Sequence, residues 1–124
     1  MIRVLVVDNQ APVRRGLRMR LALEPDLEVV GTARDSQEAL MLAHVLAPDV
    51  IVMDVQMPGV DGIATIKHLQ QAAPTCRVVV LTLNDDKHTR TRAHLAGAHA
   101  FVEKQGNSEF LLTEIRRVAS LSTL

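Results

Sequence analysis

Five short, largely apolar runs recur along this chain, and a segment with the residue spacing of a helix follows each of them. Runs of this kind, bounded by turn residues and without a clear polar face, predict strands that are buried on both faces. That is typical of a parallel sheet covered by helices. The predicted strands are Ile2–Val7, Leu27–Ala33, Val50–Met53, Val78–Leu81 and Ala98–Val102.

Capping residues and prolines mark where the intervening helices begin and end. Pro12 suits the first turn of a helix, and Pro48 and Pro74 stop the second and third helices. Asp35, three residues before Glu38, is a candidate N-cap. The predicted helices run from Pro12 to Leu23, from Asp35 to Ala47, from Ile63 to a point before Pro74, from about Asp85 to Ala96, and onward from Asn107 or Ser108.

Strand and helix therefore alternate five times, which predicts an α/β fold of the (βα)₅ type. Because crossovers between parallel strands are right-handed, the five strands are expected to form a doubly wound parallel sheet. The 124 residues are enough for one domain with a real core and too few for two ordinary ones, so we expect a single domain over residues 1–124. No apolar run approaches the roughly 18 residues that a membrane span requires.

Composition argues against several classes of function. Lys and Arg together number 14, as do Asp and Glu, so no overall positive charge exists to hold a nucleic acid. The absence of Trp and Tyr disfavours a stacking platform for bases or flavins. Neither G-x-G-x-x-G nor G-x-x-x-x-G-K occurs, which argues against nucleotide binding.

The sulfur and imidazole side chains do not indicate a metal site or a nucleophile. Cys76 is the only cysteine, so it cannot form an internal disulfide, and we expect it in the core of a cytoplasmic protein. The five histidines lack the i, i+4 spacing of a helical metal pair. They are His44, His68, His88, His94 and His99.

Polar residues follow the predicted strands at their carboxyl ends. In a doubly wound sheet these ends face the crevice where ligands bind, at the point where the strand order reverses. Side chains from separate parts of the sequence are therefore expected to meet there. The strand-end residues are Asp8 with Asn9, Asp35, Asp54, Thr82 and Lys104.

Asp54 begins the pattern D-x-x-M-P-x-x-D-G, in which Asp61 and Gly62 suit a turn and a helix start. With the acidic end of the first strand, Thr82 after VVVL and Lys104 after GAHAFVE, the chain resembles the receiver domain of two-component response regulators. The resemblance covers essentially the whole chain and is greatest to the NarL/FixJ (LuxR-type) branch. It implies the flavodoxin-like fold of CheY-like proteins.

The resemblance implies that Asp54 accepts a phosphoryl group from a histidine kinase with Mg²⁺, and that the chain is not a classical enzyme. Lys104 would then contact a phosphoryl oxygen, Thr82 would turn toward the phosphoryl group, and Phe101 would move into the space that Thr82 leaves. A carboxylate attacks an anionic phosphoryl donor only when charge is neutralised and the attack is aligned, which suits this set. The implied Mg²⁺ ligands are Asp8, Asn9, Asp54 and the Gln56 carbonyl.

The resemblance also implies partners. Helix 1 carries Arg14, Arg15, Arg18 and Arg20, which by themselves are most simply interpreted as a plain solvated face. The resemblance adds a second interpretation, since in this family helix 1 is also where the kinase docks. Homodimers would form through helices 1 and 5, or through the face of helix 4, strand 5 and helix 5. DNA would be contacted only through an output domain, which is not present in this chain, so the chain is either an excised regulatory half or a stand-alone receiver.

Several positions depart from the family pattern. Asn9 stands where a second acid is usual, so a metal site would have two carboxylates in place of three. Leu83 replaces a small residue, and Gln105 stands where the branch often has Asp. These departures leave open a receiver that works by contacts without phosphorylation. Gln10 disfavours a phosphatase with an aspartyl nucleophile, and Gln56 and Asn84 are expected to flank the phosphoryl group.

Overall fold

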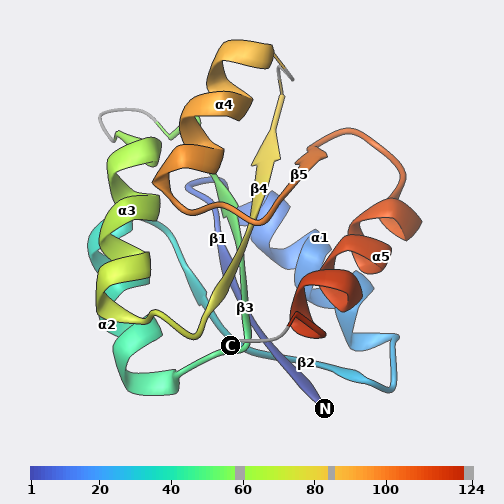
Figure 1. Cartoon of the computed structure of the whole chain (residues 1–124). Helices are drawn as coiled ribbons and strands as arrows, with labels where there is room; N and C mark the ends of the chain where they lie inside the picture. The colour runs from blue at the N-terminus through green and yellow to red at the C-terminus, as the bar shows by residue number, and fades with distance from the viewer. Residues whose placement is uncertain (58–60, 84–85, 122–124) are drawn as a thin grey trace.

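The computed structural model describes residues 1–57, 61–83 and 86–121. In this part of the chain five strands alternate with five helices, as predicted (Figure 1). The strands are β1 (Ile2–Val7), β2 (Leu27–Ala33), β3 (Val50–Asp54), β4 (Arg77–Thr82) and β5 (Ala100–Glu103). The helices are α1 (Ala11–Ala22), α2 (Ser36–Leu46), α3 (Gly62–Ala72), α4 (Lys87–Ala96) and α5 (Ser108–Ala119).

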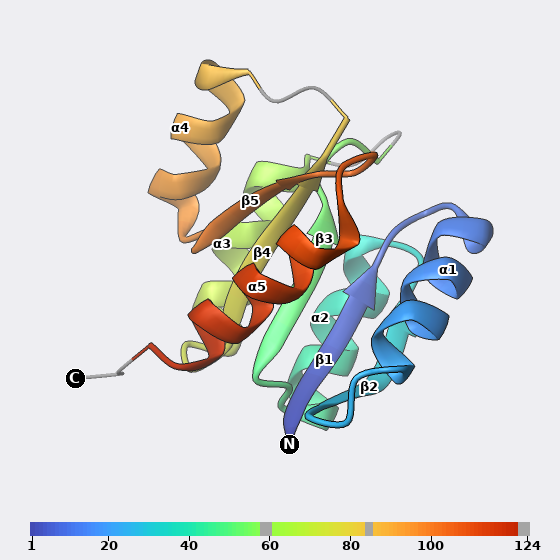
Figure 2. The same ribbon diagram turned by 90° about the vertical axis from the view of Figure 1, so that its right-hand side faces the viewer.

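The strands form one parallel sheet in the order β2-β1-β3-β4-β5, so the doubly wound topology is confirmed. Helices α1 and α5 cover one face, and α2, α3 and α4 cover the other (Figures 1 and 2). The strand order reverses between β1 and β3, which pair directly, with Val7 beside Met53 at their carboxyl ends. A crevice at this switch point is where the topology places a ligand.

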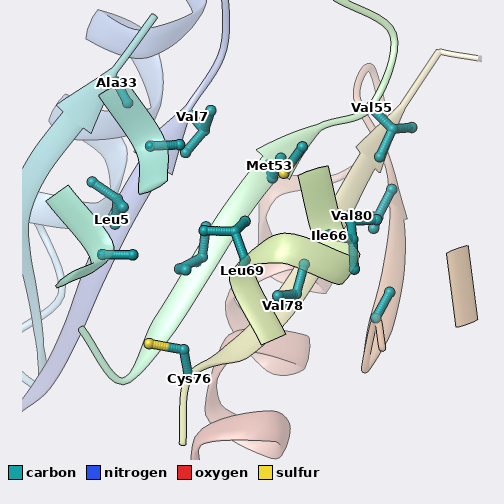
Figure 3. Packing of buried hydrophobic residues seen from close by; sticks show 14 of the residues in the cluster. Leu5, Val7, Ala33, Met53, Val55, Ile66, Leu69, Cys76, Val78 and Val80 are labelled. Carbon is teal, nitrogen blue, oxygen red and sulfur yellow. The ribbon is translucent and has the colours of Figure 1, made fainter. Parts of the chain in front are cut away.

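Alternate residues of the strands supply two separate hydrophobic cores. On β1, Leu5 and Val7 face the α2–α4 side, where they join Ile66 and Leu69 of α3 (Figure 3). Val4 and Val6 belong to the core beneath α1 and α5, with Leu21, Leu112 and Ile115. Because both faces are covered, the β1 residues from Val4 to Val7 are fully buried, which explains the apolar run in the sequence.

Several element boundaries differ from the predicted ones, and at the ends of β3 and β4 the reason is that strand pairing extends past the apolar residues. Asp54 pairs with Leu81 and is the last residue of β3, and Thr82 pairs with Glu103. β5 begins at Ala100 and not at Ala98. Helix α4 begins at Lys87, later than predicted, because the Asp86 side chain accepts a hydrogen bond from the Thr89 amide and caps it. Asp85 lies outside the described residues.

The predicted N-cap of α2 is confirmed, and α5, which was predicted to start near Asn107 or Ser108, begins at Ser108 with Asn107 as its N-cap. Asp35 Oδ1 accepts from the Glu38 amide at 2.8 Å, and Asn107 Oδ1 accepts from the Glu109 amide at 2.7 Å. At the other end of α2, Arg3 Nη1 donates to the carbonyl oxygens of Leu46 and Ala47 at 2.6 and 2.9 Å. This contact ties the start of β1 to a helix end whose carbonyls have no helical partner.

The burial of Cys76 and the lengths of the helices match what the sequence predicts. Cys76 is buried in the core on the α3 side, and burial raises the pKa of its thiol, so it is a poor nucleophile. Within the described residues, every helix is too short or too polar to cross a membrane.

Candidate functional site at the carboxyl edge of the sheet

Two buried carboxylates stand at the ends of β1 and β3. Asp8 is 0% exposed and Asp54 is 2% exposed. In each, one carboxylate oxygen accepts a hydrogen bond from the amide two residues further on: Gln10 N to Asp8 Oδ1 and Gln56 N to Asp54 Oδ1, both at 2.8 Å. These short loops fix the orientation of both carboxylates and leave the second oxygen of each to face the crevice.

Lys104, which follows β5, joins the two carboxylates. Its ammonium lies 2.8 Å from Asp8 Oδ2 and 3.0 Å from Asp54 Oδ2, and its amide donates to the Thr82 carbonyl at 2.8 Å. Burial, the largest influence, favours the neutral amine, but the contacts with the two carboxylates together outweigh it and raise the pKa of Lys104. The ammonium therefore stays charged at neutral pH and offsets one of the two negative charges.

Thr82 and Phe101 lie on neighbouring strands, but not at the same level of the sheet. Thr82 is buried at the end of β4, beside the crevice. Phe101 pairs with Val80 in the sheet register, two residues before Thr82, and is half-buried at the border of the α2–α4 core. The guanidinium of Arg90 on α4 lies 5.3 Å from the centre of its ring. The structure thus brings Thr82 to the strand ends and keeps Phe101 below α4.

Asn9 is exposed, and its neighbour Asp8 has a partner that the sequence analysis missed. Arg14 Nη1, from the first turns of α1, donates to the Asp8 carbonyl at 2.7 Å. A second missed contact joins the loops after β3 and β4, where Gln56 Oε1 accepts from the Leu83 amide at 2.9 Å. No pattern in the sequence predicts either contact, because the sequence shows only that a polar residue stands at each position.

The crevice offers the hard oxygen ligands that Mg²⁺ prefers. Among the described residues, Asp8 Oδ2 is fully buried, and its charged neighbour is the Lys104 ammonium at 2.8 Å. Such an oxygen suits a cation. No group of three or more His, Cys, Asp or Glu residues that could hold a metal occurs in the described ranges, which agrees with an amide at Asn9. In the part of the chain that the structure describes, this edge of the sheet thus presents two buried carboxylates, Asp8 and Asp54.

Some residues of the predicted site cannot be placed. Pro58, within the D-x-x-M-P-x-x-D-G pattern, and Asn84 lie outside the described residues.

Asp61 is the N-cap of α3, where its Oδ1 accepts from the Ala64 amide at 3.1 Å, so the prediction of a turn and helix start is confirmed. Gly62 begins that helix directly against the backbone of Val55.

Residues 4–116 match the family of response regulator receiver domains. The chain belongs to this family. The predicted resemblance and the flavodoxin-like, CheY-like fold are thereby confirmed. Receiver domains of response regulators partner with histidine kinases and bind Mg²⁺ at the site of phosphorylation.

Curated relatives of this receiver domain include regulators of transcription. The response regulator GacA of Pseudomonas aeruginosa is 40% identical over 118 residues, which are 95% of this chain and 55% of that protein. The transcriptional regulatory protein DegU of Brevibacillus brevis is 33% identical over 118 residues, 95% of this chain and 50% of its own length. The chain thus spans about half the length of these relatives.

Solved structures show the same fold. The signal receiver domain of the response regulator NarL from Mycobacterium tuberculosis matches with a TM-score of 0.90 and 28% identity, covering 98% of both chains. The response regulator domain of CheB from Thermotoga maritima matches with a TM-score of 0.89 and 33% identity, also covering 98% of both. The likeness to NarL agrees with the branch expected from the sequence.

Proposed function

We propose that this receiver domain accepts a phosphoryl group on Asp54 from the phosphohistidine of a sensor kinase. The observation that carries the proposal is the setting of Asp54, a buried carboxylate at the switch point, held by the Gln56 amide and by the Lys104 ammonium. In the transfer, a carboxylate oxygen of Asp54 forms a bond to phosphorus while the bond from phosphorus to the histidine nitrogen breaks. The nitrogen keeps the electron pair.

The residues around Asp54 supply the charge neutralisation that this transfer needs. Lys104 already contacts the carboxylate at 3.0 Å and can follow the negative charge as it spreads onto the phosphoryl oxygens. Asp8 and Asp54, with the Gln56 carbonyl and the Asn9 amide, are the proposed ligands of Mg²⁺. The ion would add positive charge beside the transferred group.

Thr82 and Phe101 are proposed to convert phosphorylation into a change of surface. Thr82 would turn its hydroxyl toward the phosphoryl oxygens, and Phe101, half-buried beneath Arg90, would move inward and alter how α4 meets β5. A groove of about 560 Å³ beside β5 and α5, which Phe101 and Phe110 help to line, supports an output or dimer contact on that face. Homodimers through α1 and α5 are the second arrangement expected from the sequence.

Helix α1 is the proposed docking surface for the kinase. A hollow of about 210 Å³ on this helix is lined by Arg14, Arg15 and Arg18, together with Ala11 and Thr32. Because Arg14 also contacts the Asp8 carbonyl, this arginine hollow lies next to the crevice. DNA would be reached through an output domain of the kind that the relatives' role in transcription implies. The cytoplasmic location and the single-domain organisation stay predictions.

The proposal is tested by incubation with acetyl phosphate and Mg²⁺, followed by intact-mass spectrometry. We expect the mass of one added phosphoryl group, and its loss in Asp54→Ala. The matched control is Asp61→Ala, which removes an exposed carboxylate that caps α3 and should keep the adduct. An adduct that persists in Asp54→Ala would contradict the assignment.

A receiver that acts by contacts alone is the second candidate, and Asn9 is the observation that favours it. With two carboxylates near the crevice, the chain has less charge to hold a divalent ion than the family usually provides. The two candidates differ in one outcome. If neither acetyl phosphate nor a histidine kinase gives an adduct, the contact-only function is the one that stands.

A further inference from the structure

Gln56 makes two contacts that together span the mouth of the crevice. Its amide donates to Asp54 Oδ1 at 2.8 Å, and its side-chain oxygen Oε1 accepts from the Leu83 amide at 2.9 Å. Although Gln56 is exposed, its side chain is thus held between the loops that follow β3 and β4. We call the second contact the Gln56–Leu83 hydrogen bond.

The Leu83 amide belongs to the rim of the same crevice. It directly follows Thr82, whose carbonyl accepts from the Lys104 amide, and β4 pairs with β3 up to Leu81 beside Asp54. Beyond the last paired residue of a strand, a backbone N–H needs another acceptor. In this chain the neutral amide oxygen of Gln56 supplies it.

A phosphoryl group on Asp54 would bring three anionic oxygens to this rim. An N–H group binds an anionic oxygen about twice as strongly as a neutral one. We propose that the Gln56 side chain competes with the phosphoryl group for the Leu83 amide, so that phosphorylation displaces the Gln56 side chain. This inference rests on the proposed phosphorylation of Asp54. It assigns Gln56 as a positioning residue that opposes the phosphorylated state.

The effect of this competition extends toward α4. That helix buries a single side chain, Ala93, so its own packing holds it weakly against the sheet. The Gln56–Leu83 hydrogen bond is therefore an additional constraint on Leu83, just after β4. Its release on phosphorylation would remove this constraint from Leu83, which follows the strand that pairs with β5 and Phe101.

The test is Gln56→Met, which keeps the length of the side chain and removes the acceptor. Beryllofluoride with Mg²⁺ serves as the phosphoryl analogue, and binding and amide hydrogen exchange are followed by NMR on the full chain. In the ligand-free variant the Leu83 amide should lose its protection from exchange. Beryllofluoride should bind about two- to tenfold more tightly, the change expected from the net contribution of one hydrogen bond.

The matched control is Gln37→Met, the same substitution at an exposed residue of α2, which should change neither measurement. Unchanged protection of Leu83, or beryllofluoride binding that is equal or weaker in Gln56→Met, would overturn the competition. If beryllofluoride binds neither the variant nor the wild type, the proposed function fails together with the inference. If it binds both equally, the competition alone fails.

Discussion

Asn9 is the residue that most alters the electrostatics of this crevice. It is exposed beside the buried Asp8, and it offers an amide oxygen where a carboxylate would face the cation. Two unit charges about 4 Å apart interact by about 1 kcal/mol in water and about 4 kcal/mol at an effective dielectric constant of 20. Repulsion from Asp8 and Asp54 would cancel part of any gain from a third carboxylate.

We therefore predict that Asn9→Asp binds Mg²⁺ about tenfold more tightly, which isothermal titration calorimetry would measure. Asn9→Ala removes the amide oxygen without adding charge, so its affinity should equal that of the wild type or be weaker. Equal affinity in the wild type and in Asn9→Asp would show that residue 9 does not face the ion.

Alanine substitutions of Gly62 and Gly16 form a matched pair, because they compare a glycine that has no room for a Cβ with one that has ample room. A Cβ on Gly62 would lie 2.3 Å from the Val55 carbonyl oxygen, whereas a Cβ on Gly16, inside α1, has nothing within 4 Å. Gly62→Ala should lower the free energy of unfolding by about 1–3 kcal/mol, because the backbone next to Asp54 must shift. Gly16→Ala should raise it by about 0.5–1 kcal/mol, because alanine favours the helix.

Urea denaturation of both glycine variants checks this prediction, and the opposite signs make each the control of the other. A stable Gly62→Ala would mean that α3 can begin further from β3 than the structure shows. Labelling with acetyl phosphate should also be weaker in Gly62→Ala, since Val55 connects the phosphoacceptor to this helix.

Among the secondary-structure elements, the connection from α4 to β5 is where prediction and structure differ most. Ala98 and His99 look like the start of a strand in the sequence, yet β5 begins at Ala100. His99 still pairs with β4, because its amide donates to the Val78 carbonyl at 2.8 Å and its ring Nδ1 accepts from the Val78 amide at 3.1 Å. A side chain thus replaces one backbone acceptor, which an apolar pattern cannot reveal.

This arrangement predicts a pH dependence of stability. Burial, followed by the positive charges of Arg77 and Arg117 and by His94, lowers the pKa of His99 below its ordinary value of 6.5. Between the lowered pKa and 6.5 the unfolded chain binds more protons than the folded one, so stability falls as the pH falls through this window. Above it, the contribution of His99 to stability is fully present.

We expect His99→Asn, whose amide oxygen can also accept from Val78, to lose less stability on acidification than the wild type. Thermal unfolding at pH 7.5 and pH 5.5 would measure the difference between the two proteins. Because the other histidines titrate in both proteins, their effect cancels in the comparison. Equal losses would mean that His99 is not protonated on unfolding.

For the molecule as a whole, the sequence predicted the sheet and the meeting of strand-end residues, but not the contacts between them. The rule that ligands bind at the carboxyl ends of parallel strands predicts that Asp8, Asp54 and Lys104 lie close together. The contact of Arg14 with the Asp8 carbonyl depends on which rotamer a long side chain adopts. The same holds for the Gln56–Leu83 hydrogen bond, because both arise from packing and neither belongs to a repeating pattern.

Charge is balanced over the chain but not over its surface. The net charge is zero, yet the arginine hollow on α1 gathers Arg14, Arg15 and Arg18 without a carboxylate among its lining residues. Because α1 also has no acidic residue in its first turn, these cations are not offset near the positive end of the helix dipole. A partner with an acidic surface would gain by docking there, since complementary charge speeds association.

The double substitution Arg15→Glu and Arg18→Glu separates docking from chemistry. With a histidine kinase that phosphorylates the wild type, we expect phosphotransfer to slow at least tenfold at low ionic strength and the defect to shrink as salt screens the charges. Labelling by acetyl phosphate should stay unchanged, because that small donor needs no docking surface. Arg92→Glu, a charge reversal on exposed α4, is the control that should leave kinase transfer intact. If both donors slow equally, the arginines act on the crevice itself and α1 is not the docking surface.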